Sequence, residues 1–301
     1  YYLIYIILME LYKQKVDQAI VGQFYKIDNI INEDCDLYDQ DSGELIFTFK
    51  KKIIADETYN IDPKIVKHSQ MLSYNRGSAG GIVNSKGIRR GMEGWKKKPE
   101  CPCDKNGNPL PEGHEKHTSY FKYEDGRISK RARSNSVASQ SIGGFDKSPQ
   151  HPCRLTFWTK NNLKAYESIF PLCKDISDKY FSYCPDKWLG QYEKYQNCPQ
   201  DYVIPETNFS TLTINCDFRT ACHRDRGDCK AGLTAFTVKR LGDYRGGELC
   251  FPEYQLGLNI EQGDLLLFNP HTAHSNNPLV GKGRMSFVLY LREKMDRCES
   301  I

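Results

Sequence analysis

The stretch TLTINCDFRTACHRD, residues 211–225, decides the fold: a run rich in Thr, Leu and Ile leads into His223-Arg224-Asp225. Downstream, short runs rich in Leu, Phe, Val and Thr recur, separated by Gly, Pro, Asp or Asn. This spacing is typical of an antiparallel sandwich or jelly roll. We therefore predict an α+β fold with a double-stranded β-helix (jelly-roll) core over residues 141–296. The predicted strands are Thr211–Cys216, Leu233–Val238, Glu248–Phe251, Gly257–Ile260, Asp264–Phe268 and Ser286–Leu291.

Further elements are predicted on the amino-terminal side of this core. Strand-like alternation runs through Glu44–Ile54, and Cys153–Trp158 reads as another strand. A helical repeat of apolar residues spans 162–183, where Pro171 is expected to kink or split the helix. These elements flank the jelly roll.

Composition divides the chain into three parts. Residues 1–85 are predicted to pack on the core as an extension, and residues 86–140 form a basic, loop-rich segment. The chain is 39% hydrophobic and 27% charged, which argues against disorder throughout, and its net charge of +4 neither demands nor excludes a polyanionic partner.

Two features indicate an intracellular protein. Tyr1–Met9 is apolar but too short to span a bilayer and lacks the features of a signal peptide. The 12 cysteines are irregularly spaced, so most are interpreted as free thiols, several of them buried. No membrane association is expected, and the oligomeric state is left open.

Four side chains of the predicted jelly roll form a candidate iron and co-substrate site. Residues two apart in a strand point to the same side, so His223 and Asp225 converge. With His274 they complete the two-His, one-Asp set of non-haem Fe(II) oxygenases. Arg284 offers a planar fork for the far carboxylate of 2-oxoglutarate. His271 is an alternative to His274 as the distal ligand. Jelly-roll dioxygenases usually place this His about ten positions before the arginine, which favours His274, so His271 is expected to be structural or to lie beside the metal ligands.

A family resemblance rests on six segments: Ser141–Asp146, Cys153–Phe157, Phe209–Asn215, Arg219–Asp228, Tyr244–Leu249 and His274–Arg284. Through these segments the chain resembles the TET/JBP family of nucleic-acid base dioxygenases over residues 139–294. The resemblance implies Fe(II) and 2-oxoglutarate as cofactor and co-substrate, with ascorbate as a possible addition. It implies oxidation of a methyl group on a DNA base, 5-methylcytosine or thymine, in a duplex whose target base has flipped out.

Two positions are candidates for substrate binding through this resemblance. Family members read the base partly with the polar residue three after the iron-binding Asp, here Asp228, whose carboxylate accepts from the amino group of cytosine. The alternative is that Asp228 only forms a turn. Relatives acting on 5-methylcytosine usually carry His where this chain has Arg292, which still donates to a base acceptor or a phosphate.

Basic clusters precede the core at Arg89-Arg90, Lys96–Lys98 and Arg127–Arg133. They are predicted to neutralise phosphates of DNA, with Trp95 and Tyr120 stacking or wedging; the alternative is a solvated charge run. Four further residues, Cys101, Cys103, His114 and His117, have a spacing tighter than usual zinc sites, so free thiols are favoured over a zinc site.

The functional prediction is hydroxylation of 5-methylcytosine in DNA to 5-hydroxymethylcytosine, which places the protein in the nucleus. The alternatives are a thymine hydroxylase of the same family, a dioxygenase acting on a protein or small molecule, and a catalytically inactive DNA-binding module. The presence of His223, Asp225, His274 and Arg284 argues against the inactive module. The sequence context, the extent of oxidation and the choice between DNA and RNA stay open.

Overall fold

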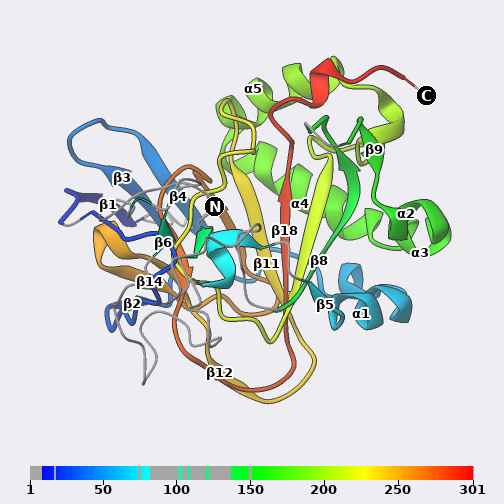
Figure 1. Ribbon diagram of the computed structural model, residues 1–301. Helices are drawn as coiled ribbons and strands as arrows, with labels where there is room; N and C mark the ends of the chain where they lie inside the picture. Colours follow the sequence, from blue (N-terminus) through cyan, green and yellow to red (C-terminus); the bar gives the residue numbers. More distant parts are fainter. Residues whose placement is uncertain are drawn as a thin grey trace, which may run out of the picture.

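The computed structural model describes residues 9–16, 18–73, 76–81, 102–103, 108, 120–121, 137–148 and 151–300. Its largest feature is a ten-stranded sheet in the order β1-β3-β4-β15-β11-β18-β10-β8-β5, with β9 paired to β8 (Figure 1). The strands of this sheet are β1 (Met9–Lys13), β3 (Cys35–Asp39), β4 (Leu45–Lys50), β5 (Leu72–Ser73), β8 (Val137–Phe145), β9 (Arg154–Leu155), β10 (Thr211–Cys216), β11 (Thr234–Arg240), β15 (Leu265–Phe268) and β18 (Arg284–Tyr290).

A smaller sheet and several helices complete the described part of the chain. The smaller sheet has the order β16 (Ser275–Asn276), β13 (Leu249–Phe251), β14 (Leu256–Leu258) and β2 (Ile30–Ile31). Two separate pairs are β12 (Tyr244–Gly246) with β17 (Leu279–Gly281), and β6 (Pro102–Cys103) with β7 (Tyr120–Phe121). The α-helices are α1 (Pro63–Ser69), α2 (Phe157–Asn161), α3 (Leu163–Glu167), α4 (Phe170–Tyr183) and α5 (Pro185–Gln196). The 3-10 turns are η1 (Asp56–Tyr59), η2 (Gly77–Gly80), η3 (Gln200–Tyr202), η4 (Pro252–Tyr254) and η5 (Met295–Arg297).

Alternation along the central strands separates two hydrophobic cores. Phe287 of β18 and Leu267 of β15 belong to one core, whereas their neighbours Val288 and Phe268 pack into the other. Successive residues of a strand point to opposite faces, so each strand contributes to both cores. In the second core Phe251 of the smaller sheet lies 6.0 Å from Phe268, ring centroid to ring centroid. The two sheets therefore face each other as a jelly-roll sandwich.

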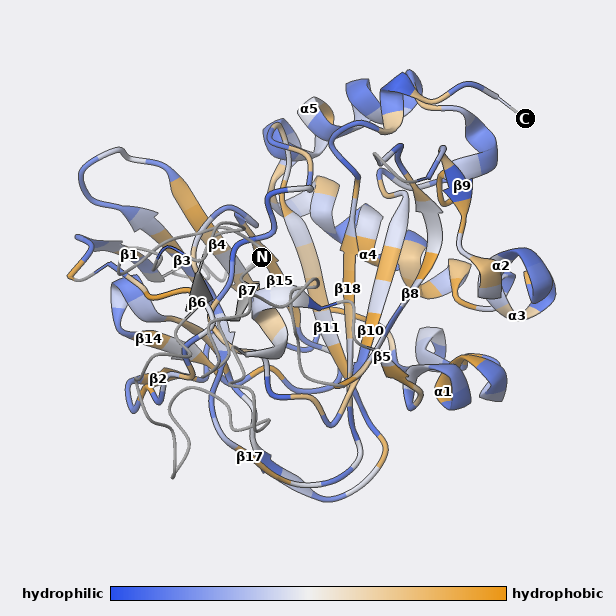
Figure 2. Cartoon of the chain, in the orientation of Figure 1, coloured by the Kyte–Doolittle hydropathy of each residue, from blue (hydrophilic) through white to orange (hydrophobic). Residues whose placement is uncertain are grey.

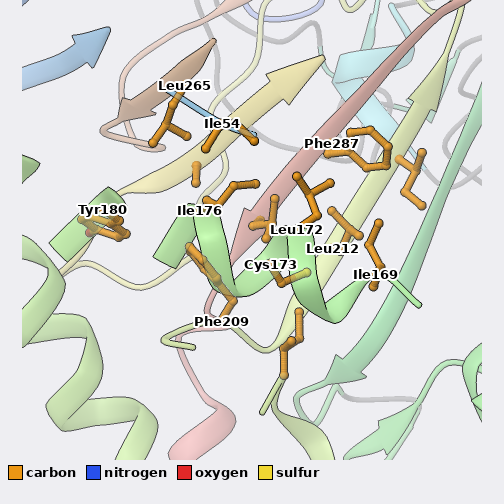
Figure 3. Packing of buried hydrophobic residues seen from close by; sticks show 14 of the residues in the cluster. Ile54, Ile169, Leu172, Cys173, Ile176, Tyr180, Phe209, Leu212, Leu265 and Phe287 are labelled. Atoms are coloured by element: carbon orange, nitrogen blue, oxygen red, sulfur yellow. The ribbon is translucent and has the colours of Figure 1, made fainter. Parts of the chain in front are cut away.

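The first core lies between the outer face of the large sheet and helix α4. Leu172, Cys173 and Ile176 of α4 point toward Leu212 and Phe287 of the sheet (Figure 3). Colouring by hydropathy shows hydrophobic segments along the central strands, whereas the outer helices α1 and α5 are mostly hydrophilic (Figure 2). Covering this face with helices makes the architecture α+β and leaves the inner face for the site.

One predicted strand is partly wrong. The range Cys153–Trp158 was expected to be extended throughout, but β9 contains Arg154–Leu155 alone. The Thr156 hydroxyl accepts from the Thr159 N–H and caps α2, so the chain turns into a helix at this point. The predicted helix over 162–183 is split, and Pro171 lies in the first turn of α4, where a missing N–H costs least.

The inner face of the large sheet is polar over β8, β10 and β18. Because the residues flanking Thr213 face the helices, Thr213 points inward. Its hydroxyl lies 2.8 Å from the Ser141 hydroxyl and 3.1 Å from the Tyr290 hydroxyl. Nearby, the Asn215 amide donates to the Ser286 hydroxyl at 3.3 Å. The inward-facing side chains of β8, β10 and β18 therefore form a hydrophilic surface inside the sandwich.

Cys153 and Cys298 form a disulfide, and eight further cysteines whose side chains the structure describes are free and buried. The predicted basic clusters, and the side chains of the possible zinc group, lie outside the described residues. Within the described ranges, no helix combines the length and the apolar character needed to cross a bilayer.

Candidate metal centre

The structure brings His223, Asp225 and His274 together. His223 and His274 face each other across an isolated antiparallel bridge, in which each backbone N–H donates to the other carbonyl at 3.0 Å. The Asp225 carboxylate lies 3.8 Å from Nε2 of His223 and 3.4 Å from Nε2 of His274. All three potential ligand atoms lie within 4.8 Å of one another. This is the spacing expected of side chains that share one metal ion.

Both imidazoles are oriented by backbone carbonyls. Nδ1 of His223 lies 2.8 Å from the Ala221 carbonyl oxygen, and Nδ1 of His274 lies 2.9 Å from that of Thr272. A hydrogen bond at Nδ1 fixes the tautomer and leaves Nε2 with its lone pair toward the metal. Both Nε2 atoms point to the Asp225 carboxylate, so the donor set fits a divalent transition metal.

The charge of Asp225 also suits a metal ligand. Burial alone raises the pKa of this carboxyl, but the neighbouring His223 and His274 and the Arg76 guanidinium outweigh burial and hold the pKa well below its usual range. The backbone N–H of Asp225 donates to the Pro270 carbonyl at 2.8 Å, which fixes the loop. An ionised carboxylate is therefore available at neutral pH.

His271 does not join this convergent group. Its Nε2 is buried without a hydrogen-bond partner in the described part of the chain, and burial lowers its pKa. Its carbonyl accepts from Nη1 of Arg224 at 2.9 Å, while Nη2 of Arg224 donates to buried Glu253 at 2.6 Å. Arg224 thus ties the loop that carries His223 and Asp225 to the loop before His274.

Arg284 lies at the start of β18 and is 4% exposed. Its Nη2 is buried and has no hydrogen-bond partner among the described residues, and burial lowers its pKa. A Cβ at Gly247, whose φ is +77°, would lie 3.0 Å from Cδ of Arg284, so the glycine leaves space for this side chain. A buried cation with a free donor is costly unless an anion joins it. The residue therefore fits the carboxylate of a co-substrate.

Arg76 is a second cation near the centre, and sequence reasoning missed it. It lies in the turn before η2, and its Nη2 donates to the Ser141 hydroxyl at 2.9 Å. Its Nε is buried without a partner in the described ranges. The positive charge of Arg76 helps to lower the pKa of Asp225, so Arg76 acts electrostatically on the metal site. No local motif marks it, because the amino-terminal segment reaches the jelly roll through tertiary packing.

Asp228 and Arg292, the two residues predicted to bind the substrate, lie next to each other. They pair in an isolated antiparallel bridge, and Nη1 of Arg292 lies 3.9 Å from Oδ1 of Asp228. Asp228 is 4% exposed and accepts from the Thr234 hydroxyl at 3.1 Å. Burial and the charge of Asp225 raise the pKa of Asp228, and Arg292 opposes this shift.

Comparisons with known proteins indicate the family of this chain. A family model for Tet_JBP, the oxygenase domain of the 2OGFeDO superfamily, matches residues 142–293. Thymine dioxygenase JBP1 of Trypanosoma brucei brucei is 36% identical over 146 residues, which are 46% of this chain and 17% of that protein. The bifunctional helicase and thymine dioxygenase JBP2 of Leishmania major is 33% identical over 147 residues, 48% of this chain and 13% of that protein. The chain thus matches less than a fifth of the length of these relatives.

A solved structure described as NgTET1 in complex with 5mC DNA is similar in fold. The similarity covers 95% of this chain and 83% of that one, with a TM-score of 0.56 and 11% sequence identity. At this identity the similarity concerns the fold alone, and it confirms the predicted jelly-roll core.

Proposed function

The chain belongs to the Tet_JBP family, the oxygenase domain of the 2OGFeDO superfamily, and from this premise we propose that it hydroxylates the methyl group of a pyrimidine in DNA, foremost 5-methylcytosine. The observation that carries the proposal is the convergence of His223, Asp225 and His274 in one fold with the buried, incompletely paired Arg284. An inactive binding module has no need to keep such a costly arrangement.

The residues have distinct roles in this proposal. His223, Asp225 and His274 hold Fe(II). Arg284 binds the far carboxylate of 2-oxoglutarate through Nη2, which has no hydrogen-bond partner among the residues that the structure describes. When bound, Fe(II) and 2-oxoglutarate supply the activation of dioxygen that oxidises a C–H bond. The Arg224 guanidinium and the carbonyls of Ala221 and Thr272 keep the ligands aligned. Arg76 adds positive charge where an anionic co-substrate must lie beside Asp225.

A pyrimidine is favoured by the pair Asp228 and Arg292. Although burial raises the pKa of Asp228, a carboxyl group keeps an acceptor oxygen in either protonation state, and this oxygen accepts from the exocyclic amino group of cytosine. The Arg292 guanidinium donates to the neighbouring N3 and O2 acceptors. This arrangement satisfies the whole pairing edge of a flipped cytosine. The similar NgTET1 structure is a complex with 5mC DNA, which supports the same substrate class. Action on DNA would place the protein in the nucleus.

Thymine is the second candidate substrate. The relatives that are 33–36% identical to this chain are named thymine dioxygenases. With thymine, Asp228 accepts from N3–H and Arg292 donates to one carbonyl, which leaves the second carbonyl without that donor. With a deprotonated Asp228 the pair therefore accommodates both bases but pairs more fully with cytosine, whereas a protonated Asp228 donates to the second thymine carbonyl.

Competition between two oligonucleotides tests this ranking. Duplexes that carry 5-methylcytosine or only thymine at one position are supplied together with Fe(II) and 2-oxoglutarate, and hydroxymethyl nucleosides are counted by mass spectrometry. We expect preference for 5-methylcytosine in the wild type and a smaller preference in Asp228→Ala. Equal preference in both proteins would mean that another residue reads the base, and hydroxymethyluracil alone would establish the thymine reaction.

A further inference from the structure

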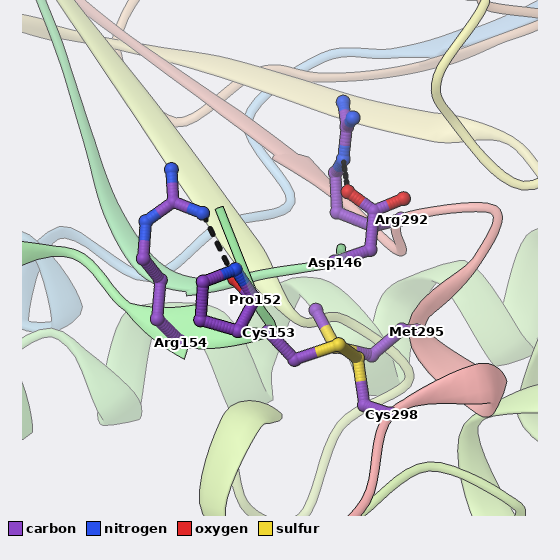
Figure 4. The surroundings of a disulfide bond; sticks show 7 residues. All are labelled: Asp146, Pro152, Cys153, Arg154, Arg292, Met295 and Cys298. Atoms are coloured by element: carbon purple, nitrogen blue, oxygen red, sulfur yellow. Dashed lines mark hydrogen bonds and ion pairs between the residues drawn. A yellow bond between two sulfur atoms is a disulfide. The ribbon is translucent and has the colours of Figure 1, made fainter. Parts of the chain in front are cut away.

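The Arg292 guanidinium is held from more than one side. Its Nε donates to Oδ1 of Asp146 at 3.0 Å, and Asp146 is 7% exposed (Figure 4). Its Nη1 approaches Asp228 at 3.9 Å, and its Cζ lies 5.5 Å from the centroid of the Phe145 ring. A guanidinium that donates through Nε to a carboxylate has its remaining four N–H groups fixed in one plane. Asp146 therefore determines which way the two Nη groups point.

The Arg292 guanidinium packs directly against the backbone of Gly227. A Cβ at position 227 would lie 2.5 Å from Nη1 and 2.9 Å from Cζ and Nη2 of Arg292, closer than real Cβ contacts. The backbone at Gly227 has no left-handed φ, so the glycine is needed for space rather than for conformation. Its carbonyl also accepts from the Glu293 N–H at 2.9 Å, which fixes the backbone beside Arg292.

The Nη groups remain available to a substrate. In the described part of the chain neither Nη atom forms a hydrogen bond within the protein, and the Arg292 side chain is 25% exposed. Both Nη groups of Arg292 lie next to the buried Asp228 carboxyl, which accepts a hydrogen bond from the Thr234 hydroxyl. A partly exposed guanidinium whose Nε is hydrogen-bonded to the protein can use its two Nη groups to donate to two adjacent acceptors on a ligand.

From these contacts we propose that Asp146 is a positioning residue: it acts through Arg292 and, with the space left by Gly227, directs the two Nη groups at the pairing edge of the pyrimidine. This inference rests on the proposed function, because the pyrimidine is the ligand that Arg292 contacts there. Asp146 does not touch the substrate. Its loss allows the guanidinium to turn away and weakens substrate binding without changing the metal centre.

A substrate-free measurement tests the holding of Arg292. Arginine modification by phenylglyoxal, followed by peptide mass spectrometry, reports how freely each guanidinium is reached. We expect faster modification at Arg292 in Asp146→Ala than in the wild type, with Asp146→Asn between them because its amide oxygen still accepts from Nε. The matched control is Asp178→Ala, an exposed carboxylate on α4 that pairs with Lys174. An unchanged rate at Arg292 in Asp146→Ala would overturn the proposal.

A double-mutant cycle then tests the action on substrate. Asp146→Ala is expected to lower kcat/KM for methylated duplex by roughly ten- to a hundredfold, the range for loss of a hydrogen bond to a charged group. The same change is expected to have no further effect in an Arg292→Ala background, because the two residues act as one unit. Gly227→Ala should behave in the same way. Independent, multiplying losses would contradict a positioning role.

An assay without DNA distinguishes the positioning role of Asp146 from the proposed oxidation of pyrimidines. Succinate formation from 2-oxoglutarate in the absence of DNA is expected to be the same in the wild type, Asp146→Ala and Asp178→Ala, which shows that each variant is folded and its metal site is intact. If the wild type oxidises neither pyrimidine, the proposed function fails, while the phenylglyoxal rates still decide whether Asp146 holds Arg292.

Discussion

Replacing Arg284 with methionine separates a ligand-binding arginine from a structural one. Methionine keeps an unbranched apolar stem in the space beside Gly247 but removes the guanidinium. Among the described residues Nη2 of Arg284 has no hydrogen-bond partner although it is buried, and such a group costs about 1–3 kcal/mol. We therefore expect the free energy of unfolding without 2-oxoglutarate to stay within ~1 kcal/mol of the wild type or to rise.

The loss should appear when 2-oxoglutarate is added. Removing one partner of a buried charge pair typically costs about 2–5 kcal/mol, which corresponds to a roughly 30-fold to several-thousand-fold weaker affinity. A ligand at about 100 times its Kd stabilises the folded state by about 2.7 kcal/mol, and Arg284→Met should lose this increment. Urea unfolding with and without 2-oxoglutarate, in the presence of a redox-inert divalent metal, measures both quantities.

Arg240 provides the matched control. It pairs with Arg284 across β11 and β18, but it is exposed, and its guanidinium lies over the Tyr244 ring at 4.1 Å. Arg240→Met should therefore keep the stabilisation by 2-oxoglutarate. Wild-type affinity in Arg284→Met, or a loss of more than ~2 kcal/mol of stability without the ligand, would refute the assignment of Arg284 to the co-substrate.

Three other changes have defined outcomes. His274→Ala should abolish metal-dependent succinate formation while His271→Ala retains it, and the reverse result in a metal-binding titration would exchange their roles. Arg76→Met should raise the KM for 2-oxoglutarate by about tenfold or more, from the loss of a charged donor, and an unchanged KM in steady-state assays would remove it from the site. Reducing the Cys153–Cys298 disulfide, whose cysteines are 145 residues apart, should lower the free energy of unfolding by at most about 5 kcal/mol in the chain-entropy account; guanidinium unfolding of Cys298→Ser would detect this, and no loss would mean that the bond adds no stability.

The strands of the jelly roll were predictable because their signal is local. The predicted range Thr211–Cys216 coincides with β10, and the expected strand near Leu265 is also present. Alternation and turn residues encode such strands within a few positions. The order of His223, Asp225, His274 and Arg284 along the chain likewise identified the candidate centre before any coordinates.

Other features depend on contacts between distant segments and were missed. Phe157 begins a helix because Thr156 caps it, although the apolar run favoured a strand. Arg76 reaches Ser141 across 65 positions, and Asp146 reaches Arg292 across 146 positions. The disulfide between Cys153 and Cys298 was not singled out among 12 irregularly spaced cysteines. No periodic pattern in the sequence encodes such pairings. The residues that surround the metal ligands could therefore be identified only from the structure.

Mass spectrometry of nucleosides tests the central claim most directly. Methylated duplex DNA is incubated with the protein, Fe(II), 2-oxoglutarate and ascorbate, and each component is omitted in turn. The proposed function predicts 5-hydroxymethylcytosine that requires both Fe(II) and 2-oxoglutarate and is absent in Asp225→Ala. Succinate without any oxidised base would contradict the DNA substrate, and 5-hydroxymethylcytosine formed by Asp225→Ala would contradict the metal centre itself.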